Sequence, residues 1–183
     1  MVRVGRLFGV GDRDRMVEFT VTYLEMDARP NYPRPHQPLG PAAALLHAEK
    51  PPAWYYMSLY QAVGEHYAWE DKKKLSRDEL RAYVQHPERA LYTLIRQGWP
   101  AGFFMLDHTE TGVCDLAIFG LVPEMVGQGY GKYLLQEAIH TAWDHANTQK
   151  LTVNTCTLDH PHALALYQSA GFSPVRQELK SRD

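Results

Sequence analysis

The stretch 122-VPEMVGQGYGKYLL-135 is the most informative part of this sequence. It places three glycines, Gly127, Gly129 and Gly131, within five residues and directly before an apolar run with helical spacing. Glycines let a backbone approach an anion closely, and a helix start leaves free N–H groups that carry partial positive charge. The stretch therefore predicts a site for an anion such as a pyrophosphate, to which Lys132 could add a cation.

Two common nucleotide-binding motifs do not fit this stretch. A P-loop requires Gly-Lys followed by Ser or Thr, which binds Mg²⁺, whereas here Tyr133 follows Lys132. A dinucleotide fingerprint requires Gly or Ala at its third conserved position, which is Leu134 in this sequence. The predicted anion site therefore belongs to neither motif.

The elements around the glycines predict a crossover unit. Apolar runs predict strands over 113–122 and 150–158, and an apolar stripe predicts a helix from about 130 to 146. Two strands joined by a helix in this way are expected to lie parallel in one sheet. A last helix over 161–170, with Pro161 at its first position and Gly171 as its cap, precedes a closing strand over 172–179.

The first half of the chain predicts a strand, a long loop and helices. Alternation of apolar and polar residues predicts a strand over 17–28. The segment 30–41 contains five prolines in twelve residues, so we expect an extended surface loop. Helices are predicted over 42–48 and 54–69 from their apolar spacing.

A third helix and a β-hairpin follow in the middle of the chain. The capping box Ser76-Arg77-Asp78-Glu79 predicts a helix start, and His86-Pro87 predicts its end. The runs 90–97 and 101–108 predict a hairpin around the turn 98–100. Helices followed by an antiparallel meander indicate an α+β fold, and 183 residues indicate one domain.

Composition excludes several classes of function. The chain is 45% hydrophobic and 22% charged with a net charge of -2, so it has no bulk attraction for nucleic acid or an anionic membrane. Cys114 and Cys156 lie in apolar runs and are expected to be reduced core thiols. The segment 1–15 is too weakly apolar for a signal peptide, and no run reaches transmembrane length, so a cytoplasmic protein is expected.

The second half of the chain, about residues 88–179, resembles the core of the GNAT N-acetyltransferase family. The resemblance rests on 125-MVGQGYG-131 with its flanking strand and helix, on strand 150–158, and on 163-ALALYQSAGF-172. The family's loop reads Arg/Gln-x-x-Gly-x-Gly/Ala, and its backbone amides hold the pyrophosphate of acetyl-CoA. Val126 stands where the family has Arg or Gln, so weakened or adjusted binding is expected.

The resemblance implies an α+β fold in one domain, 1–183, with a mixed, splayed sheet of about six to seven strands flanked by helices. Residues 17–87 would supply the first strand, the proline-rich loop and the acceptor-side helices, and 88–179 the acetyl-CoA core. The resemblance also implies a set of cofactor-binding residues on the strand, on the loop and before the last helix. They are Phe119, Gly120, Leu121, Val126, Gly127, Gln128, Gly129, Tyr130, Gly131, Lys132 and His160.

Two catalytic roles follow from the same resemblance. Tyr167 matches the general acid that protonates the departing CoA thiolate, although periodicity alone favours an ordinary core aromatic. Asp115 lies where some members carry an acidic base that acts through water, although a solvent-exposed strand-end Asp is the alternative. Glu65 and His66 are rival bases. His160 replaces a frequent Asn and either contacts the cofactor or caps the helix.

The implied activity is direct transfer of acetyl from acetyl-CoA to a primary amine of a small or amino-acid-like acceptor. Aromatic residues and acids in 54–71 suit such an acceptor. The alternatives are acetylation of a protein or peptide, and a catalytically weak CoA-binding sensor. His160 and His162 lack a standard metal-ligand spacing, so no metal is expected. A homodimer is possible.

Overall fold

The computed structural model describes residues 17–67 and 69–182. The expectation that 1–15 is no signal peptide lies outside the described residues. Within the described part, no helix is both long enough and apolar enough to span a membrane.

The centre of the molecule is one mixed sheet of seven strands in the order β2-β3-β4-β5-β6-β1-β7. The strands are β1 (Val17–Met26), β2 (Ala43–Ala48), β3 (Arg89–Arg96), β4 (Trp99–Asp107), β5 (Val113–Leu121), β6 (Lys150–Cys156) and β7 (Ser173–Arg182). Among the described strands, β5 and β6 pair in parallel, and the other neighbouring pairs are antiparallel. The predicted α+β fold and its crossover are therefore confirmed.

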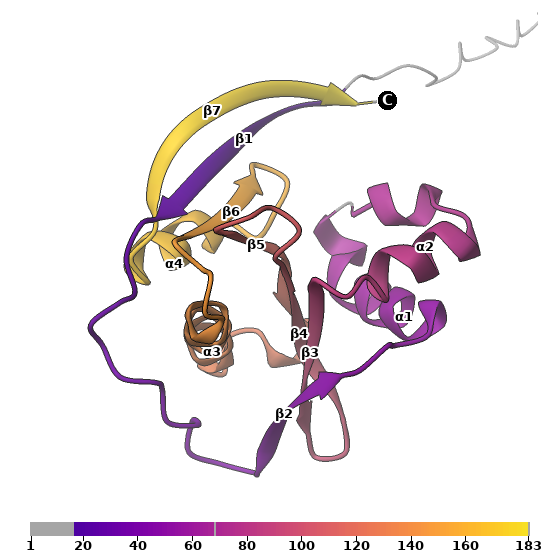
Figure 1. Ribbon diagram of the computed structural model, residues 1–183. Helices are drawn as coiled ribbons and strands as arrows, with labels where there is room; N and C mark the ends of the chain where they lie inside the picture. Colours follow the sequence, from indigo (N-terminus) through magenta and orange to yellow (C-terminus); the bar gives the residue numbers. More distant parts are fainter. Residues whose placement is uncertain (1–16, 68, 183) are drawn as a thin grey trace, which may run out of the picture.

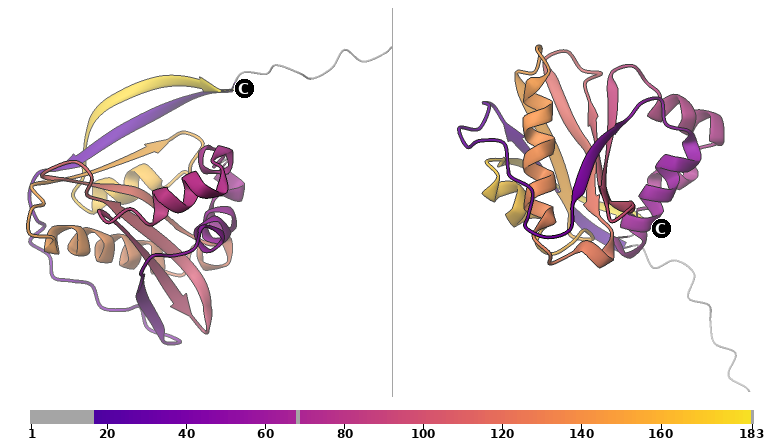
Figure 2. Two further views of the ribbon diagram at one scale, coloured as in Figure 1. Left: turned by 45° about the vertical axis from the view of Figure 1, so that its right-hand side comes forward. Right: turned by 90° about the horizontal axis from the view of Figure 1, so that it is seen from below.

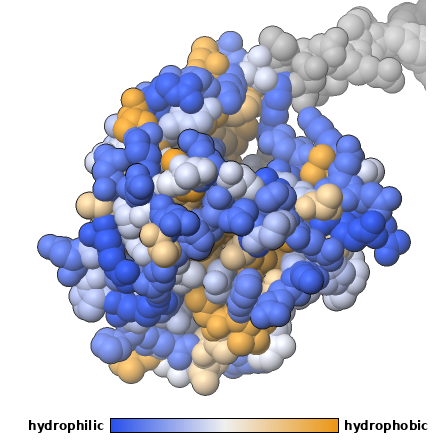
Figure 3. Space-filling view, in the orientation of Figure 1, coloured by the Kyte–Doolittle hydropathy of each residue, from blue (hydrophilic) through white to orange (hydrophobic). Residues whose placement is uncertain are grey.

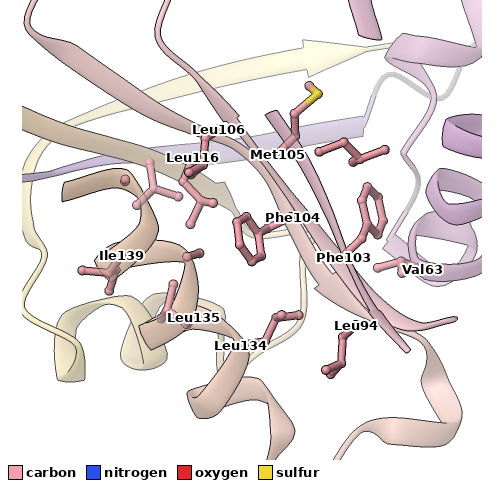
Figure 4. Packing of buried hydrophobic residues seen from close by; sticks show 14 of the residues in the cluster. Val63, Leu94, Phe103, Phe104, Met105, Leu106, Leu116, Leu134, Leu135 and Ile139 are labelled. Atoms are coloured by element: carbon pink, nitrogen blue, oxygen red, sulfur yellow. The ribbon is translucent and has the colours of Figure 1, made fainter. Parts of the chain in front are cut away.

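Helices cover both faces of the sheet (Figures 1 and 2). They are α1 (Ala53–Gly64), α2 (Arg77–Val84), α3 (Tyr130–Asp144) and α4 (Ala163–Ser169), with short 3-10 turns η1 (Glu65–Tyr67), η2 (Asp71–Lys74) and η3 (Pro123–Met125). Successive strand residues point to opposite faces. On β4, Phe103 therefore points toward Val63 of α1, whereas Phe104 points toward Leu134 and Leu135 of α3 (Figure 4). One strand thus anchors both helical layers.

The two parallel strands splay apart, as the resemblance implied. Ladder pairs join β5 and β6 at three positions, from Val113–Lys150 to Asp115–Thr152. Beyond Asp115, no ladder pair joins them in the described part of the chain. A register irregularity places Leu116 and Ile118 of β5 opposite consecutive residues of β4, so the strand is bulged where the gap opens.

The first strand has a position that the sequence did not indicate. β1 lies between β6 and β7 and is antiparallel to both. Its second half, Val21–Met26, pairs with β6, whereas residues 17–20 pair with β7 alone. The outer parts of β1 and β7 therefore curve away from the sheet as a two-stranded arm (Figure 2).

Three local predictions were wrong or shifted. The predicted helix 42–48 is the edge strand β2, which pairs with β3 along its whole length, so sheet pairing overrides helical propensity. The last helix begins at Ala163 rather than at Pro161. The hairpin turn is Gln97-Gly98, and Trp99 already belongs to β4.

The predicted capping box is present at the start of α2. The Ser76 hydroxyl accepts from the Glu79 amide at 3.3 Å, and the Glu79 carboxylate accepts from the Ser76 amide at 2.8 Å. Ser76→Ala is therefore expected to lower the free energy of unfolding by about 1 kcal/mol, measured by urea denaturation. Ser58→Ala, which removes a hydroxyl bonded inside α1, is the control, and an equal loss there would contradict a special role of the cap.

Candidate active site

A cleft of about 1120 Å³ surrounds the gap between β5 and β6. Residues of β1, β5, β6, α1 and the segment after it, the start of α3, and α4 line this cleft. The alternating side chains of β1, which predicted that strand from sequence, face it: Val17, Phe19, Val21 and Tyr23. The face seen in Figure 3 is largely hydrophilic, with apolar residues in separate patches. Aromatic side chains that line the cleft include Tyr60, Tyr67, Trp69, Phe119 and Tyr167.

The glycine loop has the geometry that its sequence predicted. Gly127 and Gly129 have φ values of 80° and 83°, in the left-handed region that favours glycine. Gly129 is the N-cap of α3, so the free amides of the first helical turn begin directly after it. The Gln128 side chain donates to the Glu124 carbonyl at 2.6 Å and holds the loop against the turn before it.

The loop residues divide into two groups. Val126, Gly127, Gly131 and Lys132 line the cleft, whereas Gln128, Gly129 and Tyr130 do not. The Tyr130 side chain is buried in the core, so its contribution to an anion site is limited to its backbone. Val126 is 42% exposed, and its aliphatic side chain offers no hydrogen bond to a ligand.

Arg96 supports the loop from β3, a contact that no sequence pattern predicts. Its Nε donates to the Tyr130 hydroxyl at 3.3 Å, and its guanidinium lies 5.3 Å from the centre of the Tyr130 ring. Its Nη1 also lies 3.7 Å from the Met125 sulfur. The partners are about thirty residues away in sequence, so no local pattern could identify this contact.

The three strand residues predicted to bind the pantetheine arm, Phe119, Gly120 and Leu121, line the cleft. Their strand pairs with β4 on one edge and faces the gap on the other. A Cβ at Gly120 would lie 2.3 Å from a Val63 methyl, which shows how closely α1 packs on this face. A ligand can therefore reach the β5 backbone from the β6 side.

Tyr167 lies in this gap, on α4. Its ring packs edge-on against Phe119, with centroids 6.1 Å apart, and against Phe172 at 5.9 Å. Burial is the main cause that raises the pKa of its phenol, and the negative charges of Asp159 and Asp115 raise it further. The phenol is therefore held protonated at neutral pH, which a general acid requires.

Asp115 lies at the closed end of the gap rather than in the cleft. It lines a neighbouring cavity of about 510 Å³, and its carboxylate accepts from the Thr152 hydroxyl at 2.6 Å. Burial raises its pKa, the Thr152 hydrogen bond lowers it, and Asp107 and Glu110 raise it further. Asp115 is half-buried and hydrogen-bonded, so the alternative of a fully solvent-exposed strand-end Asp does not describe it.

Comparison with known proteins identifies the family of the chain. The family model described as the acetyltransferase (GNAT) family matches residues 52–172, more than half of the chain. The chain belongs to the GNAT family. A comparison with curated proteins finds no match.

Several solved structures share the fold. A GCN5-related N-acetyltransferase from Sphaerobacter thermophilus is 17% identical with a TM-score of 0.65, and the match covers 90% of this chain and 51% of that chain. A tandem GNAT protein from the clavulanic acid biosynthesis pathway is 13% identical with a TM-score of 0.62, covering 87% and 51%. An aminoglycoside acetyltransferase from an uncultured soil metagenomic sample is 12% identical with a TM-score of 0.57, covering 70% and 86%.

At these identities the likeness to solved structures shows the fold alone. The chain spans about half the length of the first two of these structures.

Asp159 of this GNAT chain also lines the cleft, although it was not predicted from the sequence. Its Oδ2 accepts from the Thr155 hydroxyl and from the Cys156 amide, both at 2.8 Å. Its Oδ1 accepts from the Trp69 indole N–H at 3.4 Å. The sequence shows only an Asp directly before His160-Pro161. Its hydrogen-bond partner Trp69 lies 90 residues earlier, so no local pattern connects the two residues.

His160 lines the cleft and also makes a local hydrogen bond. Its Nδ1 accepts from the His162 amide at 3.2 Å, one residue before α4 begins. Its ring lies 6.1 Å from the ring of Tyr67. The His160 ring therefore accepts a hydrogen bond from an amide at the start of α4 and also faces the cleft. Capping the helix and contacting the cofactor, the two roles expected for it, are compatible.

The remaining candidates lie elsewhere. Glu65 and His66 are exposed and do not line the cleft, so the structure does not bring these rival bases to the site. Among residues 17–67 and 69–182, no three His, Cys, Asp or Glu side chains gather as a metal site. Cys114 and Cys156 are free thiols, with Cys114 buried.

Proposed function

We propose that this protein transfers an acetyl group from acetyl-CoA to the primary amine of a small acceptor. One observation carries the proposal: the glycine loop at the start of α3 opens into the gap between β5 and β6, where Tyr167 lies. The loop amides and Lys132 would bind the pyrophosphate of acetyl-CoA. The β5 backbone at Phe119–Leu121 would bind its pantetheine arm.

The reaction would proceed in a ternary complex without an acetyl-enzyme. The acceptor ammonium first loses a proton through water to Asp115, whose raised pKa makes it a better base. The amine nitrogen then bonds to the thioester carbon, and a β5 backbone N–H stabilises the oxyanion. The C–S bond breaks, and the thiolate takes the Tyr167 proton. The second nitrogen proton leaves as the amide forms, and the Tyr167 phenol is restored through solvent.

The lining of the cleft supports a small acceptor. The rings of Tyr60, Tyr67 and Trp69 line it beside the carboxylate of Asp159, a combination that suits an organic cation. Lysine side chains line other parts of the same cleft. A structural neighbour named as an aminoglycoside acetyltransferase has been solved in complex with sisomicin. Acetylation of a protein or peptide is the alternative within the family, and a CoA-binding sensor is the alternative outside catalysis.

Release of CoA thiol in the presence of acetyl-CoA and single amines tests the function. A suitable panel is tyramine, agmatine, spermidine, sisomicin and a lysine-containing peptide. Turnover of a small amine is expected, and turnover of the peptide alone would favour the protein acetyltransferase. Tight binding of acetyl-CoA by calorimetry without turnover of any amine would favour the sensor.

The base is tested by Asp115→Asn. We expect kcat to fall about tenfold while the Kd for acetyl-CoA is unchanged, because the amide cannot accept the proton but keeps the Thr152 contact. Glu110→Gln is the matched control, since it removes a charge from the same small cavity. An unchanged kcat in Asp115→Asn, or an equal fall in Glu110→Gln, would remove Asp115 from the mechanism.

A further inference from the structure

We propose that Asp159 binds the ammonium group of the acceptor, so that the enzyme selects protonated primary amines. The inference rests on the proposed acetyl transfer and adds a specificity residue to it. Asp159 is on the loop between β6 and α4 and lines the same cleft as Tyr167 and the β5 backbone. It is distinct from Asp115, which lines the neighbouring cavity.

The two oxygens of Asp159 have different surroundings. Oδ2 accepts two hydrogen bonds at 2.8 Å, from the Thr155 hydroxyl and the Cys156 amide, and these fix the carboxylate. Oδ1 accepts a long hydrogen bond of 3.4 Å from the indole of Trp69. A carboxylate oxygen can accept more than one hydrogen bond, so Oδ1 retains capacity for a strong donor in the cleft.

The rings beside Asp159 would complete an ammonium site. The Trp69 ring lies 5.3 Å from the ring of Tyr60, and both line the cleft. A cation over the face of Trp or Tyr is stabilised by the ring electrons, most strongly where water is excluded. Because its N–H bonds to Asp159, the indole holds its ring next to the carboxylate. A ligand ammonium could thus meet a negative oxygen and a ring face together.

Two of the lysines that line the cleft contact residues other than Asp159. The Lys72 ammonium lies 3.8 Å from the centre of the Tyr83 ring, and the Lys180 ammonium donates to the Tyr23 hydroxyl at 3.0 Å. Neither is bonded to Asp159, whose charge is instead felt by the Tyr167 phenol. An amine bound to Asp159 would therefore lie close to the group that protonates the leaving thiolate.

The two carboxylates would then have separate roles. Asp159 would bind and orient the ammonium, and Asp115, at the closed end of the gap, would take its proton through water. Separate environments for two acids are a common way to divide binding and proton transfer. The division predicts different kinetic signatures for the two residues: KM for the amine should depend on Asp159, and kcat on Asp115.

Asp159→Asn tests the proposal, with the most active amine of the panel as substrate. The asparagine oxygen can keep the bonds to Thr155 and Cys156, whereas its NH2 group cannot accept from the Trp69 indole. Thermal unfolding checks that the loop remains folded. We expect KM for the amine to rise about 10- to 50-fold, since a hydrogen bond to a charged partner is lost. The value of kcat and the Kd for acetyl-CoA should stay within about threefold, and Asp159→Glu should restore part of the affinity.

Asp71→Asn is the matched control, because it removes a carboxylate that lines the same cleft on η2. An unchanged KM in Asp159→Asn, or an equal rise in Asp71→Asn, would overturn the proposal. Calorimetric titration of the same amines into the enzyme–CoA complex gives a readout without turnover. One outcome separates the two proposals: the wild-type enzyme binds an amine, Asp159→Asn weakens that binding, and no amine is acetylated. This result would refute the proposed acetyl transfer but would support the ammonium site. Absence of binding to the wild-type complex by any panel amine would overturn the ammonium site.

Discussion

Tyr167→Phe is expected to lower kcat about 100-fold while leaving the Kd for acetyl-CoA unchanged. The substitution removes the phenol hydroxyl and keeps the ring, which packs against Phe119 and Phe172. The walls of the gap should therefore stay in place. Without the phenol proton, the thiolate must leave as an anion in a largely buried site, where an unpaired charge is costly. Steady-state rates of CoA release and calorimetry with acetyl-CoA measure the two quantities.

Tyr56→Phe is the control for the loss of a buried hydroxyl. Tyr56 is fully buried on α1, and its hydroxyl interacts at most with the hydroxyl of Tyr83. Its removal should leave kcat within about twofold and should lower the free energy of unfolding by no more than about 1 kcal/mol. If Tyr167→Phe turned over like the wild type, Tyr167 would be a core aromatic, which is what periodicity alone suggests.

Features set by neighbouring residues were predictable from the sequence. The alternation in 17–28 identified β1, the capping box identified the start of α2, and the glycines identified the start of α3. Each depends on side chains within a few residues of one another, so the pattern carries the physical cause. The splayed crossover was also predictable, but through the family resemblance rather than through periodicity.

Features set by contacts between distant segments were not predictable in this way. The segment 42–48 has good helix formers, yet it pairs with β3 and becomes an edge strand. The place of β1 between β6 and β7 depends on two ladders to the last third of the chain. The pair Trp69 and Asp159 is of the same kind, so the sequence pointed to Asp115 and passed over the carboxylate that lines the cleft.

Because Val126 offers no side-chain hydrogen bond to a ligand, binding of a pyrophosphate at the loop would depend mainly on backbone amides. In this chain Arg96 and Gln128 hold the loop from outside the cleft, through Tyr130 and the Glu124 carbonyl. Neither residue is among those that line the cleft, and both side chains hold the loop in its shape. The pyrophosphate would then be bound by amides of the first turn of α3, with Lys132 beside them. The position of each amide depends on the glycines that set the loop.

Gly129→Asp is expected to weaken acetyl-CoA binding about 100-fold or more, because it places a negative charge at the N-cap where the pyrophosphate would bind. Gly129 has a φ of 83°, and a Cβ there would meet nothing within 4 Å. The new side chain therefore fits sterically, and the loss of acetyl-CoA affinity would come from backbone strain and from the added charge. Calorimetric titration with acetyl-CoA measures the affinity.

Two further variants separate the strain from the charge in Gly129→Asp. Gly129→Asn has nearly the same shape and no charge, so its loss of affinity should be smaller by about tenfold or more. Gly112→Asp introduces the same residue at a φ of 79°, in the turn before β5 and at the opposite end of that strand from the loop. It should lower stability by about 1 kcal/mol, as strain at such a position does, and leave the affinity unchanged. Unaltered affinity in Gly129→Asp would mean that the helix start does not bind the pyrophosphate. An equal loss in Gly129→Asn would mean that the shape of the loop, rather than the charge at the helix start, controls binding.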